Sequence, residues 1–226
     1  MKQYLSIWGA LLVASVTPAA LAQEIKADAQ AGAGKVAMCI GCHGIQGYQA
    51  SFPEVYKVPK ISGQNAPYIA SALQAYKKGE RRHPTMRGIA DSLSDQDIAD
   101  VAAYYANQAE QGGQAGQGSA VTAKAHDPSP DVAALIAKGA CFSCHGEGFA
   151  KPLDPSYPKV AGQYADYLFS ALKAYQHEGS GKLVGRNNPV MAGMAKQFTT
   201  AELKQLAGYI GSLPGPLQTI PEQRFR

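Results

Sequence analysis

The motif C-x-x-C-H occurs twice in this chain of 226 residues, and it constrains the fold more than any other feature. The two copies lie at residues 39–43 and 141–145 and together use all four cysteines. In this motif two thiols bond covalently to the vinyl groups of a haem, and the adjacent histidine lies against the iron. We therefore expect two covalently attached c-type haems, bound by the following residues: Cys39, Cys42, His43, Cys141, Cys144 and His145.

Two other interpretations of the paired cysteines stay open at this point. A zinc site takes four ligands from one neighbourhood, and two C-x-x-C pairs could supply them. A redox dithiol or disulfide pair usually lies in a βαβ context, but the sequence shows no alternation of strands and helices. Neither interpretation explains why a histidine follows the second cysteine in both copies, so the pattern favours covalent haem.

Residues 1–22 have the composition of a secretory signal peptide. A short basic start precedes an apolar stretch over residues 4–16 and a small-x-small cleavage sequence at residues 20–22. We expect cleavage after Ala22 and a periplasmic mature protein, since c-type haems are attached outside the cytoplasm. The alternative is an uncleaved N-terminal anchor, because signal peptides and short anchors overlap in length. No later segment approaches the length needed to span a membrane.

The charge of the chain does not indicate a nucleic-acid partner. The formal net charge is +4 and the sequence pI is about 8.8. Each haem would add two propionate carboxylates, which offset this excess. The sequence contains no Lys/Arg cluster with interleaved aromatic residues, so we expect no nucleic acid among the partners.

Phrases that recur in order after each haem motif show that the chain is an internal repeat. Residues 59–64 (PKISGQ) match residues 158–163 (PKVAGQ). A helix is expected after each phrase, with apolar residues at helical spacing. These are Tyr68, Leu73 and Tyr76 in the first copy and Tyr167, Leu172 and Tyr175 in the second. Gly79 and Gly179 fit the ends of these helices.

Further helices are expected before and after these segments. A short helix before each haem motif is predicted at residues 33–38 and 131–138. The last helix of each copy opens with a capping box, at Ser94 and Asp97 in the first and at Thr199 and Glu202 in the second. Matched apolar positions follow at helical spacing: Ile98, Val101 and Tyr104, then Leu203, Leu206 and Tyr209.

The repeat predicts two helical domains of about 85 residues each, near the small end of the usual range. The expected segments are a signal peptide (1–22), a first domain (23–106), a Gly/Gln-rich linker (107–130), a second domain (131–215) and a short polar tail (216–226). A domain of this size has a thin core that a buried haem fills. We therefore expect the haem-free domains to fold poorly.

Each iron needs a second axial ligand if the protein is an electron carrier. Met86 and Met191 are the candidates, because both lie in a proline-containing loop at matched positions before the last helix. Met194 is a rival in the second copy, but its counterpart Ile89 cannot bind iron, so the repeat favours Met191. Thioether ligands predict two low-spin haems of relatively high potential. Three histidines are alternatives that we expect instead at the surface: His83, His126 and His177.

The tandem motifs, the matched PKxxGQ phrases and the segment from methionine to last helix, above all residues 93–100 (LSDQDIAD), resemble the di-haem cytochrome c4 family. The resemblance covers essentially all of the mature chain. It implies an all-α fold of two tandem class I cytochrome c domains, each wrapped around one covalent haem. It also implies a pseudo-twofold axis between the domains, haem edges that lie close together, and electron transport in the periplasm, often to a terminal oxidase.

The resemblance extends to residues around the haem. In His/Met cytochromes a proline carbonyl accepts the Nδ1–H of the proximal histidine, which implies this role for Pro59 and Pro158. Arg81 and Arg186 are candidates for pairing with haem propionates, with solvated arginines as the alternative. Two departures, a longer first loop at residues 48–56 and a long Gly-rich linker, leave the interface between the domains open.

The predicted function is electron transfer without catalysis of a substrate. We expect a soluble carrier in transient contact with redox proteins, such as a membrane oxidase or reductase or a dehydrogenase, with peripheral membrane association allowed. One alternative is a permanent electron-accepting subunit of a dehydrogenase complex. A di-haem peroxidase or thiosulfate-oxidising enzyme is less favoured, because it requires an open, exchangeable or Cys/His distal position.

Overall fold

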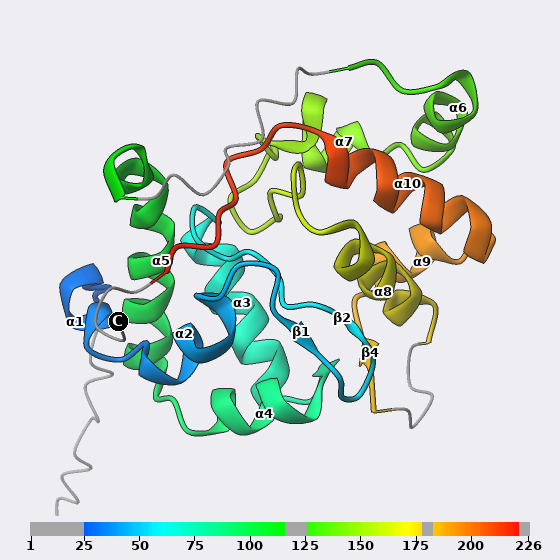
Figure 1. Cartoon of the computed structure of the whole chain (residues 1–226). Helices are drawn as coiled ribbons and strands as arrows, with labels where there is room; N and C mark the ends of the chain where they lie inside the picture. The colour runs from blue at the N-terminus through cyan, green and yellow to red at the C-terminus, as the bar shows by residue number, and fades with distance from the viewer. Residues whose placement is uncertain (1–24, 116–125, 178–182, 222–226) are drawn as a thin grey trace, which may run out of the picture.

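The computed structural model of the protein describes residues 25–115, 126–177 and 183–221. These residues form two helical halves, with short antiparallel strand pairs as the only sheet in the described part of the chain (Figure 1). The prediction of an all-α fold with two tandem cytochrome c-like halves is confirmed. The expected signal peptide and Gly179 lie outside the described residues, and the predicted domain boundaries stay predictions.

The two halves repeat one order of helices. The first half contains α1 (Ala29–Ala33), α2 (Ala37–His43), β1 (Gln49–Ala50), β2 (Tyr56–Lys57), α3 (Ala66–Lys77), β3 (Arg81–Arg82), α4 (Pro84–Asp91) and α5 (Asp95–Ala115). The second half contains α6 (Pro130–Lys138), α7 (Phe142–His145), the 3-10 turn η1 (Glu147–Phe149), α8 (Ala165–Gln176), β4 (Gly185–Arg186), α9 (Pro189–Ala195) and α10 (Thr200–Ser212). Strand β1 pairs with β2 inside the first half, whereas β3 pairs with β4 across the two halves.

Each half has its own apolar core, lined by the last helix of that half. In the first half, Ile98 and Val101 of α5 are buried. Leu203 and Leu206 of α10 are buried at the matched positions. Helical spacing predicted this face, because residues three and four apart lie on one side of a helix.

The middle helices differ from each other. Leu73 and Tyr76 of α3 are buried, as the spacing predicted, whereas the third predicted residue, Tyr68, is half-buried. The buried residues of α8 are different ones: Leu168, Ser170, Ala171 and Ala174. The predicted residues Tyr167, Leu172 and Tyr175 are half-buried instead. The prediction for α8 was therefore wrong in part. Tyr167 and Tyr175 accept hydrogen bonds from Arg186, and Leu172 packs against the core while half-buried.

Both last helices begin with the predicted capping box. The Asp97 carboxylate accepts from the backbone N–H of Ser94, and the Ser94 hydroxyl accepts from the N–H of Asp97. Thr199 and Glu202 make the same reciprocal pair at α10. These bonds satisfy N–H groups that the first turn of a helix leaves without partners.

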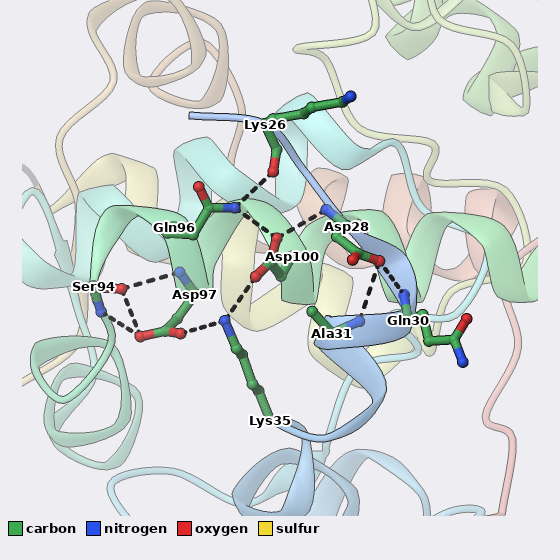
Figure 2. Close-up of polar contacts among 9 residues, drawn as sticks. All are labelled: Lys26, Asp28, Gln30, Ala31, Lys35, Ser94, Gln96, Asp97 and Asp100. Carbon is green, nitrogen blue, oxygen red and sulfur yellow. Dashed lines mark hydrogen bonds and ion pairs between the residues drawn. The ribbon is translucent and has the colours of Figure 1, made fainter. Parts of the chain in front are cut away.

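The N-terminal helix α1 is fixed on α5 by a close backbone approach and a polar network (Figure 2). A Cβ at Gly32 would overlap the carbonyl oxygen of Asp100, so glycine is required at this crossing. The side chain of Asp100 is only 3% exposed. Its carboxylate accepts hydrogen bonds from three donors: Asp28 N at 2.8 Å, Gln96 Nε2 at 2.8 Å and Lys35 Nζ at 2.6 Å. The network ties the chain just before the first haem motif to the last helix.

The predicted helix at residues 33–38 is wrong. Helix α1 ends at Ala33 with Gly34 as its C-cap, and α2 begins only at Ala37. The glycine N–H bonds to the carbonyl of Ala31, which closes the first helix before the motif. The corresponding prediction at residues 131–138 is confirmed by α6.

Two terminal segments are more structured than the sequence predicted. Helix α5 continues to Ala115, inside the segment expected to be linker, and the buried Gln108 accepts a hydrogen bond from the Ser62 hydroxyl. The tail beyond α10 runs back to the first half (Figure 1). Leu217 of this tail is buried, and Gln218 pairs with Ser62 as an isolated bridge. The tail is thus an interdomain strap rather than a free polar end.

Candidate functional site

The two C-x-x-C-H motifs lie on short helices at equivalent places. Helix α2 contains the whole of the first motif after its start at Ala37, and α7 begins directly after Cys141. None of the four cysteines is paired in a disulfide. Burial raises the pKa of Cys39 and of Cys141. In the part of the chain that the structure describes, no three His, Cys, Asp or Glu side chains gather as a metal site, so the zinc interpretation gains no support.

The proximal histidines are held by the two predicted proline carbonyls. The Nδ1 of His43 is 2.8 Å from the Pro59 oxygen, and that of His145 is 3.2 Å from the Pro158 oxygen. A carbonyl only accepts hydrogen bonds, so each Nδ1 carries the hydrogen. Burial lowers the pKa of both histidines, which keeps each ring neutral with a lone pair on Nε2. Each histidine is therefore prepared to bind a metal through Nε2.

The two candidate methionines lie on helices rather than in the predicted loops. Met86 is in α4 and Met191 is in α9, and both helices begin with a proline. A proline is favourable there because its fixed φ suits a helix and its missing N–H would have no partner. Met86 packs, together with Cys39, against the apolar core of the first half. Met191 is half-buried in the second half.

A side chain three residues before each methionine fixes its backbone. The Nδ1 of His83 accepts a hydrogen bond from the Met86 N–H at 3.3 Å. The Oδ1 of Asn188 accepts from the Met191 N–H at 3.0 Å. His83 and Asn188 are thus the N-caps of the two methionine helices, a shared role that different residue types concealed in the sequence.

Two of the rival ligands, Met194 and His126, have side-chain contacts away from the haem motifs. The sulfur of Met194 lies 3.7 Å from Gln197 Nε2 in the following turn. His126 packs edge-on against Tyr209 and contacts the Ser212 hydroxyl through Nε2. The carbonyl of His177 accepts a hydrogen bond from an arginine of the first half. The choice of Met86 and Met191 as the second axial ligands stays a prediction.

Arg81 and Arg186 meet where the two halves join, because they are register partners in the β3–β4 pair. Arg81 donates to the Tyr167 hydroxyl across the interface at 2.7 Å, and Arg186 donates to the same hydroxyl at 3.0 Å. Arg81 also donates to Tyr68, and its guanidinium lies 4.8 Å from the ring centroid of Tyr76. The solvated-arginine alternative is therefore wrong for both residues.

This arginine–tyrosine cluster has an excess of positive charge. Among the described residues, neither guanidinium forms a salt bridge with a carboxylate, and the buried Nε of Arg81 has no hydrogen-bond partner. Burial raises the pKa of Tyr167, but Arg186 and Arg81 outweigh it and bring the pKa to about 8. The lowered pKa of Tyr167 shows that the two arginines favour negative charge at this place, so the cluster is suited to an anion. The chemistry of this cluster is compatible with carboxylate groups such as haem propionates.

Sequence reasoning missed two glutamines that bind the halves together. Gln64 and Gln163 are 4% and 5% exposed, and each bonds to the backbone of a lysine in the other half. The lysines are Lys60 and Lys159, the residues directly after the proximal prolines. The matched PKxxGQ phrases were the available signal, but a repeated phrase does not reveal whether its contacts lie within or between domains.

The longer first loop, which the sequence left open, belongs to the interface. It forms the β1–β2 hairpin, and β2 packs against α8 of the second half (Figure 1). Lys57 forms an ion pair with Asp166 at 3.1 Å, and the Ser170 hydroxyl donates to Glu54 at 2.9 Å. The ring of Tyr56 lies 5.9 Å from that of Tyr167. The insertion therefore attaches the first half to the second.

Within the described ranges, no helix is both long and apolar enough to cross a bilayer.

Comparison with known proteins identifies the family. The cytochrome c family model matches residues 29–109 and 130–214. The chain is 32% identical over 197 residues to cytochrome c4 of Stutzerimonas stutzeri, which covers 82% of this chain and 89% of the relative. It is 30% identical to the thiosulfate dehydrogenase electron acceptor of Stutzerimonas stutzeri (strain A1501), over 90% of this chain and 91% of the relative. The solved structure of Acidithiobacillus ferrooxidans cytochrome c4 matches with a TM-score of 0.57 and 27% identity, over 79% of this chain and 99% of that chain.

Each of the two matched regions contains one C-x-x-C-H motif with both attachment cysteines. The protein therefore carries two covalently bound c-type haems, one in each half, and transfers electrons through them. With two such regions in tandem and a fold shared with solved cytochromes c4, the chain belongs to the cytochrome c family as a member of its di-haem cytochrome c4 group.

Proposed function

We propose that the protein is a periplasmic carrier of two electrons, in which His43 and Met86 bind one iron and His145 and Met191 bind the other. The observation that carries the proposal is the matched pair of neutral histidines, each held at Nδ1 by a proline carbonyl. In each half, a methionine stands at the start of a capped helix in the same place of the repeat. A bound haem supplies an iron that accepts and releases one electron.

The chain's own residues set the properties of each site. The proline carbonyl fixes the imidazole ring and makes it a stronger donor. The thioether stabilises the reduced iron relative to a second imidazole, so the potential is comparatively high. His43 with Met86 and His145 with Met191 would supply two protein ligands to each iron, and such ligation would favour transfer of electrons over peroxide or thiosulfate chemistry.

Arg81 and Arg186 hold the propionates of the two haems at the domain interface. The support is the buried Nε of Arg81, which has no hydrogen-bond partner within the described residues, and the second guanidinium beside it. Two cations that share one tyrosine hydroxyl can neutralise carboxylates from either side of the interface. Arg81 and Arg186 would then bring the propionate sides of both haems to the interface that the β3–β4 pair forms.

The partners are redox proteins met in brief encounters, with a terminal oxidase as the acceptor and peripheral contact with a membrane allowed. A second candidate is the electron-accepting subunit of a dehydrogenase. It is favoured by the likeness to the protein named as a thiosulfate dehydrogenase electron acceptor. Copurification from the native host separates the two. A stoichiometric dehydrogenase that survives salt washing supports the subunit, and a protein that elutes alone supports the free carrier.

A spectroelectrochemical titration of the purified holoprotein tests the carrier function. We expect two one-electron steps, low-spin spectra in both oxidation states and the weak far-red band of iron–thioether ligation in the oxidised protein. A high-spin signal with peroxide-dependent turnover would instead support the peroxidase alternative. Spectra of bis-imidazole haems would contradict the methionine assignment.

A further inference from the structure

The two halves are joined by a pair of bridges that we call the crossed lysine–glutamine bridges, formed by Lys60 with Gln163 and by Lys159 with Gln64. The Lys60 N–H donates to Gln163 Oε1 at 2.9 Å, and Gln163 Nε2 donates back to the Lys60 carbonyl at 2.8 Å. The Lys159 N–H donates to Gln64 Oε1 at 2.9 Å, and Gln64 Nε2 donates back to the Lys159 carbonyl at 2.9 Å. The two bridges therefore make the same contacts with the two halves exchanged.

The rest of each bridge is equally matched. The Lys60 ammonium donates to the Gly162 carbonyl and the Lys159 ammonium to the Gly63 carbonyl, both at 2.7 Å. Gly63 and Gly162 have φ values of +85° and +71°, a region that favours glycine. Their N–H groups donate to the last helix of their own half, at the carbonyls of Tyr105 and Ile210. Each glutamine thus stands on a turn fixed to a core helix and presents a rigid amide to the other half.

Each bridge forms a hydrogen bond with the peptide unit whose carbonyl accepts from a proximal histidine. The Pro59 carbonyl and the Lys60 N–H belong to one peptide unit. The carbonyl accepts a hydrogen bond from His43, and the N–H donates one to Gln163. Pro158 accepts from His145, and the N–H of that peptide, on Lys159, donates to Gln64. The carbonyl and the N–H of one peptide are polarised together, so a bond at one end strengthens the bond at the other. A glutamine of one domain therefore acts on the proximal histidine of the opposite domain.

We propose that Gln64 and Gln163 are positioning residues that set the redox potential of the haem in the opposite domain. The proposal rests on the proposed ligation by His43 and His145. Gln163 holds the peptide that orients His43, and Gln64 holds the peptide that orients His145. A firmer carbonyl contact makes the imidazole a stronger donor, which favours Fe(III). Docking of the halves thereby lowers both potentials together, and loosening of the interface raises them.

The test uses Gln163→Leu and Gln64→Leu in the full-length holoprotein. Haem methyl NMR signals, assigned to each attachment site by their contacts with the cysteines, report the reduction of each haem separately. Gln163→Leu should raise the equilibrium constant for reduction of the haem at Cys39 and Cys42 by about threefold. At 59 mV per tenfold change for one electron, this raises the potential by about 28 mV. Gln64→Leu should do the same to the haem at Cys141 and Cys144, and each variant should leave its own haem less changed.

Three further samples make the result decisive. Gln74→Leu removes a half-buried glutamine whose bond to Asp95 stays within the first half, and it should move the potential of neither haem. Gln163→Asn and Gln64→Asn keep a polar side chain that is too short to reach, and they should reproduce the crossed pattern if the leucine variants fold poorly. Larger changes in the haem of the mutated half, equal changes in both, or none would overturn the proposal. If the unmutated protein does not show the spectra of His/Met ligation, the proposed ligation itself is overturned.

Discussion

The two halves build the same proximal site and support it differently. The proline carbonyl, the following lysine and the glutamine occur in both, with donor–acceptor distances in the crossed bridges that agree within about 0.1 Å. The surroundings differ, because among the described residues the β1–β2 hairpin and the network around Asp100 occur in the first half alone. Between the two halves, the Pro–Lys peptide beside the proximal histidine and its contact with a glutamine of the other half differ least. What differs between the halves is the attachment of the chain around them.

The largest effect should come from removal of a proposed distal ligand. Met86→Leu should abolish the far-red thioether band of one haem and lower its potential, because an apolar side chain cannot bind iron. Met191→Leu should do this to the other haem. Optical spectra of the oxidised proteins and separate titration of the two haems check the prediction. Met194→Leu is the matched control in the second half, and loss of the band in that variant would contradict the choice of Met191.

The next largest effect should be at the crossing of α1 and α5. Gly32→Ala places a methyl group where the Asp100 carbonyl lies and should destabilise the first domain by about 3 kcal/mol through overpacking. Gly88→Ala in α4 has open space around the added methyl and should be neutral or slightly stabilising. Thermal unfolding of both holoproteins measures the difference. Equal melting temperatures would mean that the helix crossing can relax.

Removal of Asp100 should lower the stability of the first half and not that of the second, by less than the Gly32 substitution does. Asp100→Ala leaves Lys35 and the Asp28 N–H without this buried acceptor, and it should cost about 2 kcal/mol in the free energy of unfolding. Gln205, the exposed residue at the matched position of α10, provides the control Gln205→Ala, which should change little. Chemical denaturation followed separately for each haem would show the loss in the first domain. A loss of equal size in both domains would contradict the assignment.

The same network predicts a pH dependence for the first half. Hydrogen bonds from Lys35 lower the pKa of Asp100 and of Asp97, and the bond to Asp100 raises the pKa of Lys35. Carboxylates with lowered pKa values stabilise the fold above their unfolded pKa of about 4, and this contribution is lost as the pH falls through the folded pKa. The lysine contribution is complete below its unfolded pKa of about 10 and is lost at higher pH. Acid unfolding of Asp100→Asn should therefore be less steep with pH than that of the unmutated protein. Identical slopes would contradict the network.

The smallest effect should come from an exchange between the halves. His83→Asn places in α4 the cap that α9 already has, so ligation and potential should stay nearly unchanged. His83→Ala removes the acceptor from the Met86 N–H and should weaken the far-red band or shift that potential, at a stability cost of about 1 kcal/mol. If asparagine fails to restore what alanine removes, the cap is not what positions Met86.

The sequence predicted what is local and repeated. The haem motifs and the capping boxes follow from residue type and spacing, and the contact of each proximal histidine with a proline carbonyl was implied by the family resemblance. The structure shows the capping boxes and both histidine–proline contacts. Methionine helices were taken for loops because their caps differ, a histidine in one half and an asparagine in the other.

Contacts between distant segments could not be predicted in the same way. The bridges, the hairpin and the C-terminal strap join residues about 100 positions or more apart, and no local pattern encodes which surfaces meet. The composition of the tail and of the linker suggested solvated chain, yet Leu217 and Gln108 are buried against the rest of the protein. Single buried side chains in polar segments carry too little signal to reverse a prediction made from composition.

The proton NMR spectrum of the reduced holoprotein tests the central claim most directly. A methionine bound to a haem iron lies over the ring, so its methyl signal is shifted far upfield of the ordinary envelope. We predict two such signals, assigned to Met86 and Met191 and each lost in its own leucine variant. One signal, none, or a signal that belongs to Met194 would contradict the account of two matched His/Met electron-transfer sites.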